Sequence, residues 1–347
     1  MRPMTAAPYA DLTPQTVLDA LDAVGLRGDG RLLQLNSYEN RVFMVHLEDG
    51  RAVVAKFYRP GRWSDAQILE EHGFAAELEA QEIPLAAPLM LALDATAPCA
   101  NDAALIGPTL ARLKTAAGEH RYCVTPRQSG RAPELEDEAT LEWIGRFIGR
   151  IHVVGATAPF AHRLTMDVAT FGTGPRDWLL EERIVSDDVA TAWHGVTTQA
   201  LAAANDAFAC CEDLTTIRLH GDCHAGNLLW TEAGPHFVDL DDAVNGPAVH
   251  DLWMLLAGDR ATARRQLSAL LAGYETFREF DWRELRLVEA LRTLRIIHHS
   301  AWIARRWEDP AFPIAFPWFA SPAYWADQTT RLREQLDAMA EPSIGGL

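Results

Sequence analysis

The chain has 347 residues, of which 48% are hydrophobic, so it is long enough to form two packed domains or lobes. Its formal net charge of -17 excludes a protein whose main partner is nucleic acid, because binding to a phosphate backbone requires a positive surface. No apolar run approaches the roughly 20 residues that cross a bilayer, and the segment from Met1 to Asp11 lacks a signal-peptide pattern. We therefore expect a cytoplasmic protein with no membrane partner. The five cysteines have no regular spacing and are expected to be reduced thiols.

The first elements expected are a short helix and an antiparallel meander of three strands. Thr13 and Pro14 are typical of a helix start, and apolar residues recur at helical spacing until Gly25. Strand-like runs follow at residues 32–35, 42–47 and 52–57.

Lys56, in the third of these strands, is singled out by composition. Lys56 and Lys114 are the only lysines of the chain, and all the other residues counted as lysine or arginine are arginines. A lysine kept in an apolar strand indicates a specific role. Its position after Val53 parallels the strand lysine with which kinases contact the α- and β-phosphates of ATP. The alternative is a lysine at a strand edge without a ligand.

A helix is expected from Ser64 to about Gln81, because Ser64 and Gln67 form a capping-box pattern. Glu70 and Glu71 fall near its start, and either could make the ion pair that holds the strand lysine in place. We assign this role to Glu71. The alternative is a solvated acidic helix face.

The remaining pattern divides the chain into a β-rich and a helical part. Further strands are expected at 89–93, 104–106 and 121–124, and helices at 136–154, 188–211, 250–257, 261–279, 283–306 and 322–340. We therefore predict an α+β fold with two lobes: a nucleotide-binding lobe at residues 1–125 and a catalytic and substrate lobe at residues 126–347.

The stretch from Leu219 to Asp241 carries the chemistry. Asp222 is followed five positions later by Asn227, then by two apolar strands that end in Asp239. This is the spacing with which kinases hold a catalytic base and their magnesium ligands. Asp222 would receive the proton of an attacking hydroxyl, and Asn227 and Asp239 would offer the hard oxygen ligands that Mg²⁺ prefers.

Three further assignments in this region have alternatives. Asp241 either assists at the metal or bonds its own turn. His220 and His224 have the i, i+4 spacing of zinc enzymes, but that spacing converges only on a helix, and none is expected here. Asp251 either caps the apolar helix that follows or braces the backbone of the catalytic loop.

With these residues in place, the chain resembles the aminoglycoside phosphotransferase and choline kinase-like branch of the protein-kinase fold, in which glycine precedes the catalytic aspartate, as Gly221 does here. More narrowly, it is similar to a family of bacterial serine/threonine protein kinases linked to the stress response. The similarity is carried by the stretches 35–42, 56–60, 219–230, 237–247 and 302–318.

The resemblance implies ATP as co-substrate, Mg²⁺, and protein substrates with serine or threonine acceptors. We expect a monomer. It implies Asp222 as proton acceptor, Asp239 as a second catalytic residue, and Ser37 as a nucleotide contact. The segment 34–41 contains no glycine, unlike the phosphate-covering loop of ordinary protein kinases, so Ser37 and Asn40 side chains would replace backbone donors there.

The runner-up is a small-molecule kinase acting on a choline-, homoserine- or aminoglycoside-type substrate. An acidic stretch would suit a cationic acceptor, although a solvated helix start explains it equally; it comprises Glu181, Glu182, Asp187 and Asp188. The aromatic residues between Trp302 and Phe319 would either wall an acceptor site or pack in the core.

Overall fold

The structure, a computed structural model, describes residues 8–116, 118–211 and 213–345. Spatial contacts divide the chain into two units. Unit 1 runs to Arg131 and includes His236–Asp241, and unit 2 comprises Ala132–Pro235 and the chain from Asp242 onward. The lobe boundary predicted between residues 125 and 126 stays a prediction, because a division by contacts does not show which segments fold as units.

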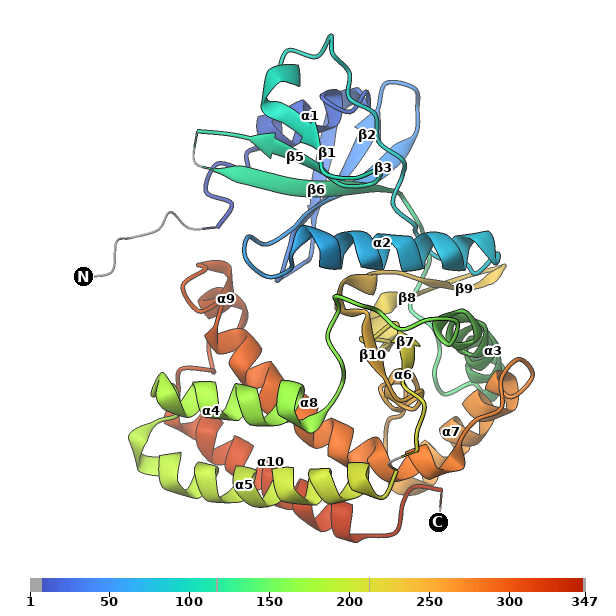
Figure 1. The fold of residues 1–347 in the computed structure, drawn as a ribbon, viewed down its shortest axis with the longest axis vertical. Helices are drawn as coiled ribbons and strands as arrows, with labels where there is room; N and C mark the ends of the chain where they lie inside the picture. The colour runs from blue at the N-terminus through green and yellow to red at the C-terminus, as the bar shows by residue number, and fades with distance from the viewer. Residues whose placement is uncertain (1–7, 117, 212, 346–347) are drawn as a thin grey trace. The chain divides into compact units, whose positions relative to one another are not determined.

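Unit 1 is built on a six-stranded antiparallel sheet with the order β1-β2-β3-β6-β5-β4 (Figure 1). Its strands are β1 (Gly28–Leu35), β2 (Arg41–Leu47), β3 (Ala52–Phe57), β4 (Ala103–Leu105), β5 (Ala111–Lys114) and β6 (Glu119–Pro126). The predicted three-strand meander is confirmed as β1, β2 and β3. The strands predicted near 104–106 and 121–124 correspond to β4 and β6.

The strand predicted at residues 89–93 is wrong. Leu89 N–H donates to the Val124 carbonyl at 2.7 Å, whereas Leu91 N–H donates to the Pro108 carbonyl at 2.7 Å. Because these bonds go to two separate segments, no continuous ladder forms, and the residues have no strand assignment.

Two helices pack on unit 1's sheet, α1 (Pro14–Asp22) and α2 (Asp65–Ala80). Side chains alternate across a strand, so Ala55 and Phe57 share a core cluster with α1. Lys56 takes the opposite face, to which Cys123 of β6 also belongs and against which Ile68 of α2 packs. The predicted capping box at Ser64 is present, and it starts α2 on that face.

Unit 2 is mainly helical. Its helices are α3 (Glu138–Gly155), α4 (Gly174–Glu181), α5 (Asp187–Ala209), α6 (His250–Trp253), α7 (Arg260–Tyr274), α8 (Val288–Ala304), α9 (Ala311–Ala315) and α10 (Pro322–Ala340). The predicted helices are confirmed within a few residues, except that 250–257 shortens to α6 and 283–306 begins with a 3₁₀ segment, Trp282–Leu287. Helices α4 and α9 were not predicted.

A helical core lies among α4, α5, α8 and α10. Trp193 and Trp325 meet edge to face there, with ring centroids 5.8 Å apart. Phe312 and Phe319 are buried in the same cluster, which supports core packing as the role of these two residues, whereas Trp318 is 45% exposed. The acidic residues from Glu181 to Asp188 are exposed, and the two aspartates lie in the first turn of α5, where the helix dipole favours them.

Two short strand pairs flank the predicted catalytic loop. β7 (Ile217–Leu219) pairs antiparallel with β10 (Val244–Gly246), and β8 (Leu228–Thr231) pairs with β9 (Gly234–Phe237). The loop at residues 220–227 therefore connects a buried strand to a hairpin.

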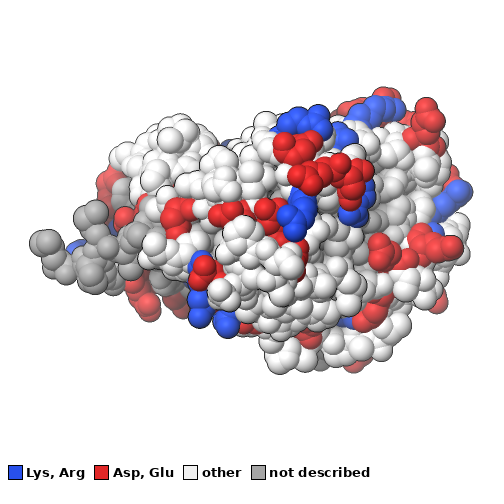
Figure 2. All heavy atoms as spheres, turned by 90° about the horizontal axis from the view of Figure 1, so that it is seen from above, with Lys and Arg blue, Asp and Glu red and all other residues white. Residues whose placement is uncertain are grey.

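Among the described residues, no helix is long and apolar enough to cross a membrane. Figure 2 shows one face of the molecule, on which basic side chains lie in small groups beside acidic ones.

Candidate active site

In unit 1, Lys56 lies among carboxylates. Its Nζ is 3.1 Å from Asp239 Oδ1 and 3.8 Å from Asp241 Oδ1, and its side chain is 14% exposed. Burial alone would lower the pKa of Lys56, but the charges of Asp239, Asp241 and Glu71 raise it well above its usual value. Lys56 is therefore a fixed cation at neutral pH.

Glu71, rather than Glu70, lies in the buried part of α2. Glu71 is 4% exposed, so it does not belong to a solvated acidic face, whereas Glu70 is half-buried. The charge of Glu71 is among those that raise the pKa of Lys56. These observations favour Glu71 over Glu70, and its role as the ion-pair partner of Lys56 stays a prediction.

Asp239 and Asp241 have different environments although they share one turn. The Asp239 side chain is 52% exposed, and its backbone has φ of 62°, a left-handed conformation that few non-glycine residues adopt. Asp241 is buried, and its Oδ2 accepts hydrogen bonds from Arg62 Nη1 at 2.6 Å and Asn40 Nδ2 at 3.1 Å. Asp239 presents oxygens to solvent, while Asp241 is engaged by neighbouring side chains.

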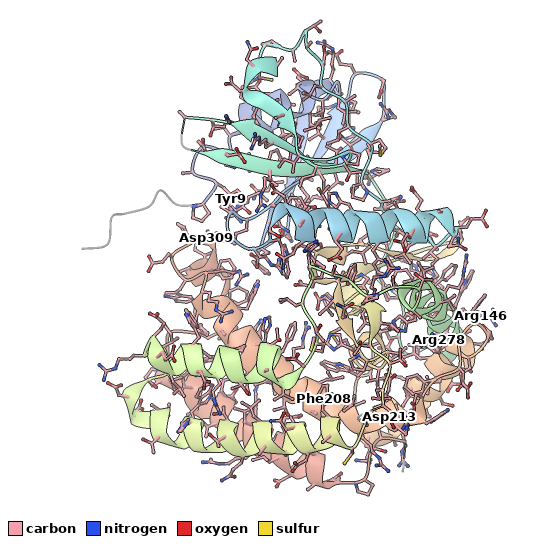
Figure 3. All side chains as sticks on the ribbon, in the orientation of Figure 1. Tyr9, Arg146, Phe208, Asp213, Arg278 and Asp309 are labelled. Atoms are coloured by element: carbon pink, nitrogen blue, oxygen red, sulfur yellow. The ribbon has the colours of Figure 1, made fainter. Side chains whose placement is uncertain are left out.

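Ser37 lies half-buried in the loop between β1 and β2. Side chains hold this loop where a glycine-rich loop would rely on its backbone. Asn40 Oδ1 accepts from Arg59 N–H at 3.2 Å, and the Tyr9 hydroxyl, labelled in Figure 3, lies 3.3 Å from the Glu39 carbonyl oxygen, to which it donates. Because the Asn40 amide contacts Asp241 and Arg59, it acts within the loop's own support, and Ser37 stays the predicted nucleotide contact.

In unit 2, the Asp222 carboxylate is held by two basic side chains. Oδ1 accepts from Arg295 Nη1 at 2.9 Å, and Oδ2 is 3.3 Å from His224 Nε2. Burial raises the pKa of Asp222, but the hydrogen bond with His224 and the Arg295 charge lower it by more, so the pKa lies well below its usual range. Asp222 is ionised throughout the neutral range.

Asn227 closes the same loop. Its Nδ2 donates to the Asp222 carbonyl oxygen at 2.9 Å and to Asp222 Oδ2 at 3.3 Å. The five-residue spacing read from the sequence therefore corresponds to a direct contact.

Asp251 braces the backbone of the catalytic loop. Its Oδ2 accepts from His220 N–H at 2.8 Å and its Oδ1 from Gly221 N–H at 2.9 Å, and His152 Nε2 lies 3.1 Å from Oδ2. Burial raises the pKa of Asp251, but the contact with His152, together with the charges of His220 and His250, holds it below its usual value. The capping interpretation is wrong, because α6 starts at His250 and Asp251 lies inside it.

Gly221 is required by the shape of this loop. Its φ is 84°, and a Cβ atom at this position would collide with the Asp242 carbonyl oxygen. The glycine that marks the motif in the sequence therefore has a steric cause.

The described residues contain no group of three or more His, Cys, Asp or Glu side chains arranged to hold a metal ion. His220 and His224 do not lie on an α-helix, so their spacing does not make a zinc pair.

The donor chemistry of Asn227, in unit 2, and that of Asp239, in unit 1, each suit a magnesium ion. Both Asn227 hydrogen bonds use its amide nitrogen, so its amide oxygen accepts none of the bonds found in the described part of the chain. Asp239 supplies a largely exposed carboxylate. Hard oxygen donors of this kind suit Mg²⁺, which keeps several waters and takes few protein groups.

The structure thus brings Lys56 and Asp239 together within unit 1, and Asp222 and Asn227 within unit 2. Sequence analysis missed Arg62 and Arg295. Neither has a local signal, since Arg295 lies 73 positions from Asp222 and Arg62 lies 179 positions from Asp241.

Comparison with known proteins gives a consistent result at three levels. Residues 31–288 match the model of the phosphotransferase enzyme family. Stress response kinase A of Salmonella choleraesuis (strain SC-B67) is 43% identical over 336 residues, which are 97% of this chain and 96% of the relative. The serine/threonine protein kinase RdoA of Salmonella typhimurium (strain LT2) is 43% identical with the same coverage of both chains.

Among solved structures, the fold is similar to that of amicoumacin kinase hAmiN in complex with AMP-PNP, Ca²⁺ and Ami. The TM-score is 0.68 at 18% sequence identity, over 95% of this chain and 94% of that one. At this identity the likeness concerns the fold alone, and it agrees with the predicted α+β, two-lobed class.

Proposed function

The chain belongs to the phosphotransferase enzyme family, in the group that includes the stress response kinases, and we propose that it is an ATP- and magnesium-dependent serine/threonine protein kinase. One observation carries the chemistry: Asp222 and Asn227, five residues apart, contact each other in a loop whose backbone is bonded to the buried Asp251. A rigid, ionised carboxylate of this kind suits phosphoryl transfer, in which the protein positions the groups and stabilises charge.

Each residue of the proposed machinery has one role. Asp222 accepts a hydrogen bond from the acceptor hydroxyl, and its low pKa keeps it in the ionised form that this requires. Lys56 binds the α- and β-phosphates, with Glu71 and Ser37 as further groups of the nucleotide site. Asn227 and Asp239 would hold magnesium, which when bound would neutralise phosphate charge.

The reaction breaks the bond between the γ-phosphorus and the β,γ-bridging oxygen of ATP and forms a bond from that phosphorus to the acceptor oxygen. ADP leaves, and the hydroxyl proton departs through Asp222. Because the pKa of Asp222 is well below its usual range, we infer that this carboxylate orients the hydroxyl and takes its proton late, when the acceptor oxygen has become acidic.

The protein acceptor and the role in the stress response are supported by the names of the full-length relatives, one of which is a serine/threonine protein kinase. A cytoplasmic location and a monomeric state also stay predictions.

The test is transfer of label from γ-labelled Mg-ATP to a generic protein substrate by the purified protein, followed by phosphoamino-acid analysis. We expect labelled serine or threonine with the native chain and a loss of at least about 100-fold with Asp222→Asn, which removes the charge that orients the hydroxyl. Asn227→Asp is a matched variant in the same loop and keeps an oxygen ligand for the metal.

Label on protein at native level with Asp222→Asn would contradict the assignment of Asp222. Transfer to small alcohols or amino alcohols without any protein label would replace the proposed acceptor by that of a small-molecule kinase.

A further inference from the structure

The Asp222 carboxylate lies beside a basic and aromatic face of α8. Arg295, which donates to Asp222 Oδ1, has a side chain that is 43% exposed. His299 follows one helical turn later on the same face and is also exposed. Trp302 stacks on His299, with ring centroids 5.5 Å apart. A molecule that reaches Asp222 along this face meets a cation and aromatic rings.

The buried carboxylate of Asp251, which also lies beside this loop, does not offset the Arg295 charge for such a molecule. Asp251 is 1% exposed, and its two oxygens accept from the backbone of His220 and Gly221 and contact His152. The Asp251 carboxylate is therefore engaged by the loop backbone and by His152, and it presents no oxygen to an acceptor.

Distance makes the sign of the acceptor's charge important. Arg295 Nη1 is 2.9 Å from Asp222 Oδ1, and an acceptor hydroxyl must lie about 2.7 Å from a carboxylate oxygen to form a hydrogen bond. The hydroxyl therefore comes within about 6 Å of the guanidinium, where charges interact strongly in a partly buried site. A cationic acceptor would be repelled by Arg295, whereas a carboxylate next to the hydroxyl would be attracted.

We propose that Arg295 is a specificity-determining residue that selects an acceptor hydroxyl with an anionic group beside it, namely a serine or threonine flanked by an acidic residue. This proposal rests on the proposed function in one respect: it takes Asp222 as the carboxylate that accepts a hydrogen bond from the acceptor hydroxyl. Arg295 then exchanges part of its contact with Asp222 for the acceptor's carboxylate and brings the hydroxyl to the base.

The experiment measures kcat/KM for three peptides of one sequence, whose central serine is flanked by aspartate, asparagine or lysine. Glycerate, glycerol and ethanolamine serve as anionic, neutral and cationic small acceptors. The proteins are the native chain, Arg295→Met, Arg295→Glu and the control Arg305→Met. Arg305 follows the last residue of the same helix, about 15 Å along its axis, and is exposed with its guanidinium 4.8 Å from the Trp178 ring centroid.

We expect the native chain to prefer the acidic over the neutral peptide by about fivefold, mainly through KM, which is the size expected for a partly exposed charge pair. Arg295→Met should abolish this preference and Arg295→Glu should invert it, while Arg305→Met should leave it unchanged. Because Arg295→Met keeps an unbranched apolar stem and removes only the charged end, it tests the proposal even if the charge reversal prevents folding.

A native preference for lysine-flanked serine or for ethanolamine would overturn the role of Arg295, and so would an acidic preference that survives in Arg295→Met. These outcomes are distinct from failure of the proposed function. Transfer to glycerate but to no peptide would contradict the protein acceptor and support the specificity role of Arg295. Transfer to basic peptides would support the protein acceptor and contradict the specificity role of Arg295.

Discussion

Gly221 and Asp239, both in the predicted catalytic segment, have left-handed backbone conformations, with φ of 84° and 62°. At Asp239 a non-glycine side chain accepts this strain, which typically costs about 1 kcal/mol or more and persists where the surroundings impose it. At Gly221 a side chain has no space, because the Asp242 carbonyl oxygen occupies the position of a Cβ atom. The glycine of the motif is thus fixed by geometry, and the aspartate by the chemistry of its side chain.

We predict that Gly221→Ala destabilises the protein by about 2–4 kcal/mol, from the left-handed backbone and the collision together. The loop that carries Asp222 must shift to relieve the contact, so activity should fall as well. Urea denaturation followed by circular dichroism measures the first effect, and label transfer from Mg-ATP measures the second.

Gly195→Ala is the matched control. Gly195 lies in α5, has open space where a Cβ would be, and is exposed. Alanine there should stabilise the protein by about 0.5–1 kcal/mol. Equal effects of the two substitutions would contradict the steric account of Gly221.

At the scale of elements, the 3₁₀ segment Trp282–Leu287 supports α6 through one buried carboxylate. Glu284 Oε2 accepts from Val249 N–H at 2.7 Å, and Val249 immediately precedes α6, which carries Asp251. Burial raises the pKa of Glu284 from its ordinary 4.5 to about 7, although the bond from Val249 opposes this. The brace of the catalytic loop is therefore linked to a group that titrates near neutral pH.

The titration of Glu284 changes the stability of the protein in a defined direction with pH. Because the folded pKa exceeds the unfolded one, the folded state binds more protons between about pH 4.5 and pH 7, and the stability contributed by this group falls as the pH rises through that window. We predict that Glu284→Gln, which keeps an oxygen for Val249 N–H, abolishes this fall and is more stable than the native chain by about 2–3 kcal/mol at pH 8.

Urea unfolding at pH 5 and pH 8 measures the free energy of unfolding of both proteins. The two should be of similar stability at pH 5 and diverge at pH 8. Glu232→Gln, at an exposed position of the β8–β9 turn, should follow the native chain at both values. If the free energies of unfolding of the native chain and of Glu284→Gln changed equally between pH 5 and pH 8, this result would contradict the titration of Glu284.

The elements that could be predicted from the sequence are those with a local signal. The meander of β1 to β3 and the capped helix α2 follow from alternation, a turn and a capping box. β5 has the sequence Ala-Arg-Leu-Lys, which carries no β-branched residue, and α4 begins with Gly-Pro directly after the π-helix Ala169–Thr173. Neither element was therefore predicted. The strand predicted at 89–93 failed because its hydrogen bonds depend on partners far along the chain.

The same limit applies to the candidate site. Spacing and strand context, which one sequence can show, predict Asp222, Asn227, Asp239 and Lys56 as site residues. Arg295 reaches Asp222 only because α8 packs in the same unit, and no spacing rule connects them. Likewise, the sequence did not decide between the two roles considered for Asp251, because the partners that reveal its bracing role lie in the loop after β7 and in α3.

At the scale of the whole molecule, the proposed nucleotide ligands and the Asp222 loop belong to different units, each with a hydrophobic core of its own. The core of unit 1 joins α1 to the sheet, and that of unit 2 joins α4, α5, α8 and α10. Ser37, Lys56, Glu71 and Asp239 all lie in unit 1. A ligand that binds a folded unit stabilises it by about 2.7 kcal/mol at 100 times its dissociation constant.

We therefore predict that Mg-ATP slows hydrogen exchange most strongly in unit 1, in peptides that cover β1 to β3 and α2. Exchange followed by mass spectrometry at peptide resolution measures this directly. EDTA should reduce the protection, because in the proposed site Asp239 would hold the magnesium that binds together with ATP. Lys56→Met should abolish it, whereas Lys114→Met, which removes the other lysine of the chain at an exposed position of β5, should not. Protection that persists in Lys56→Met, or that ignores EDTA, would contradict the assigned nucleotide site, since both changes remove a group on which binding of the phosphates depends.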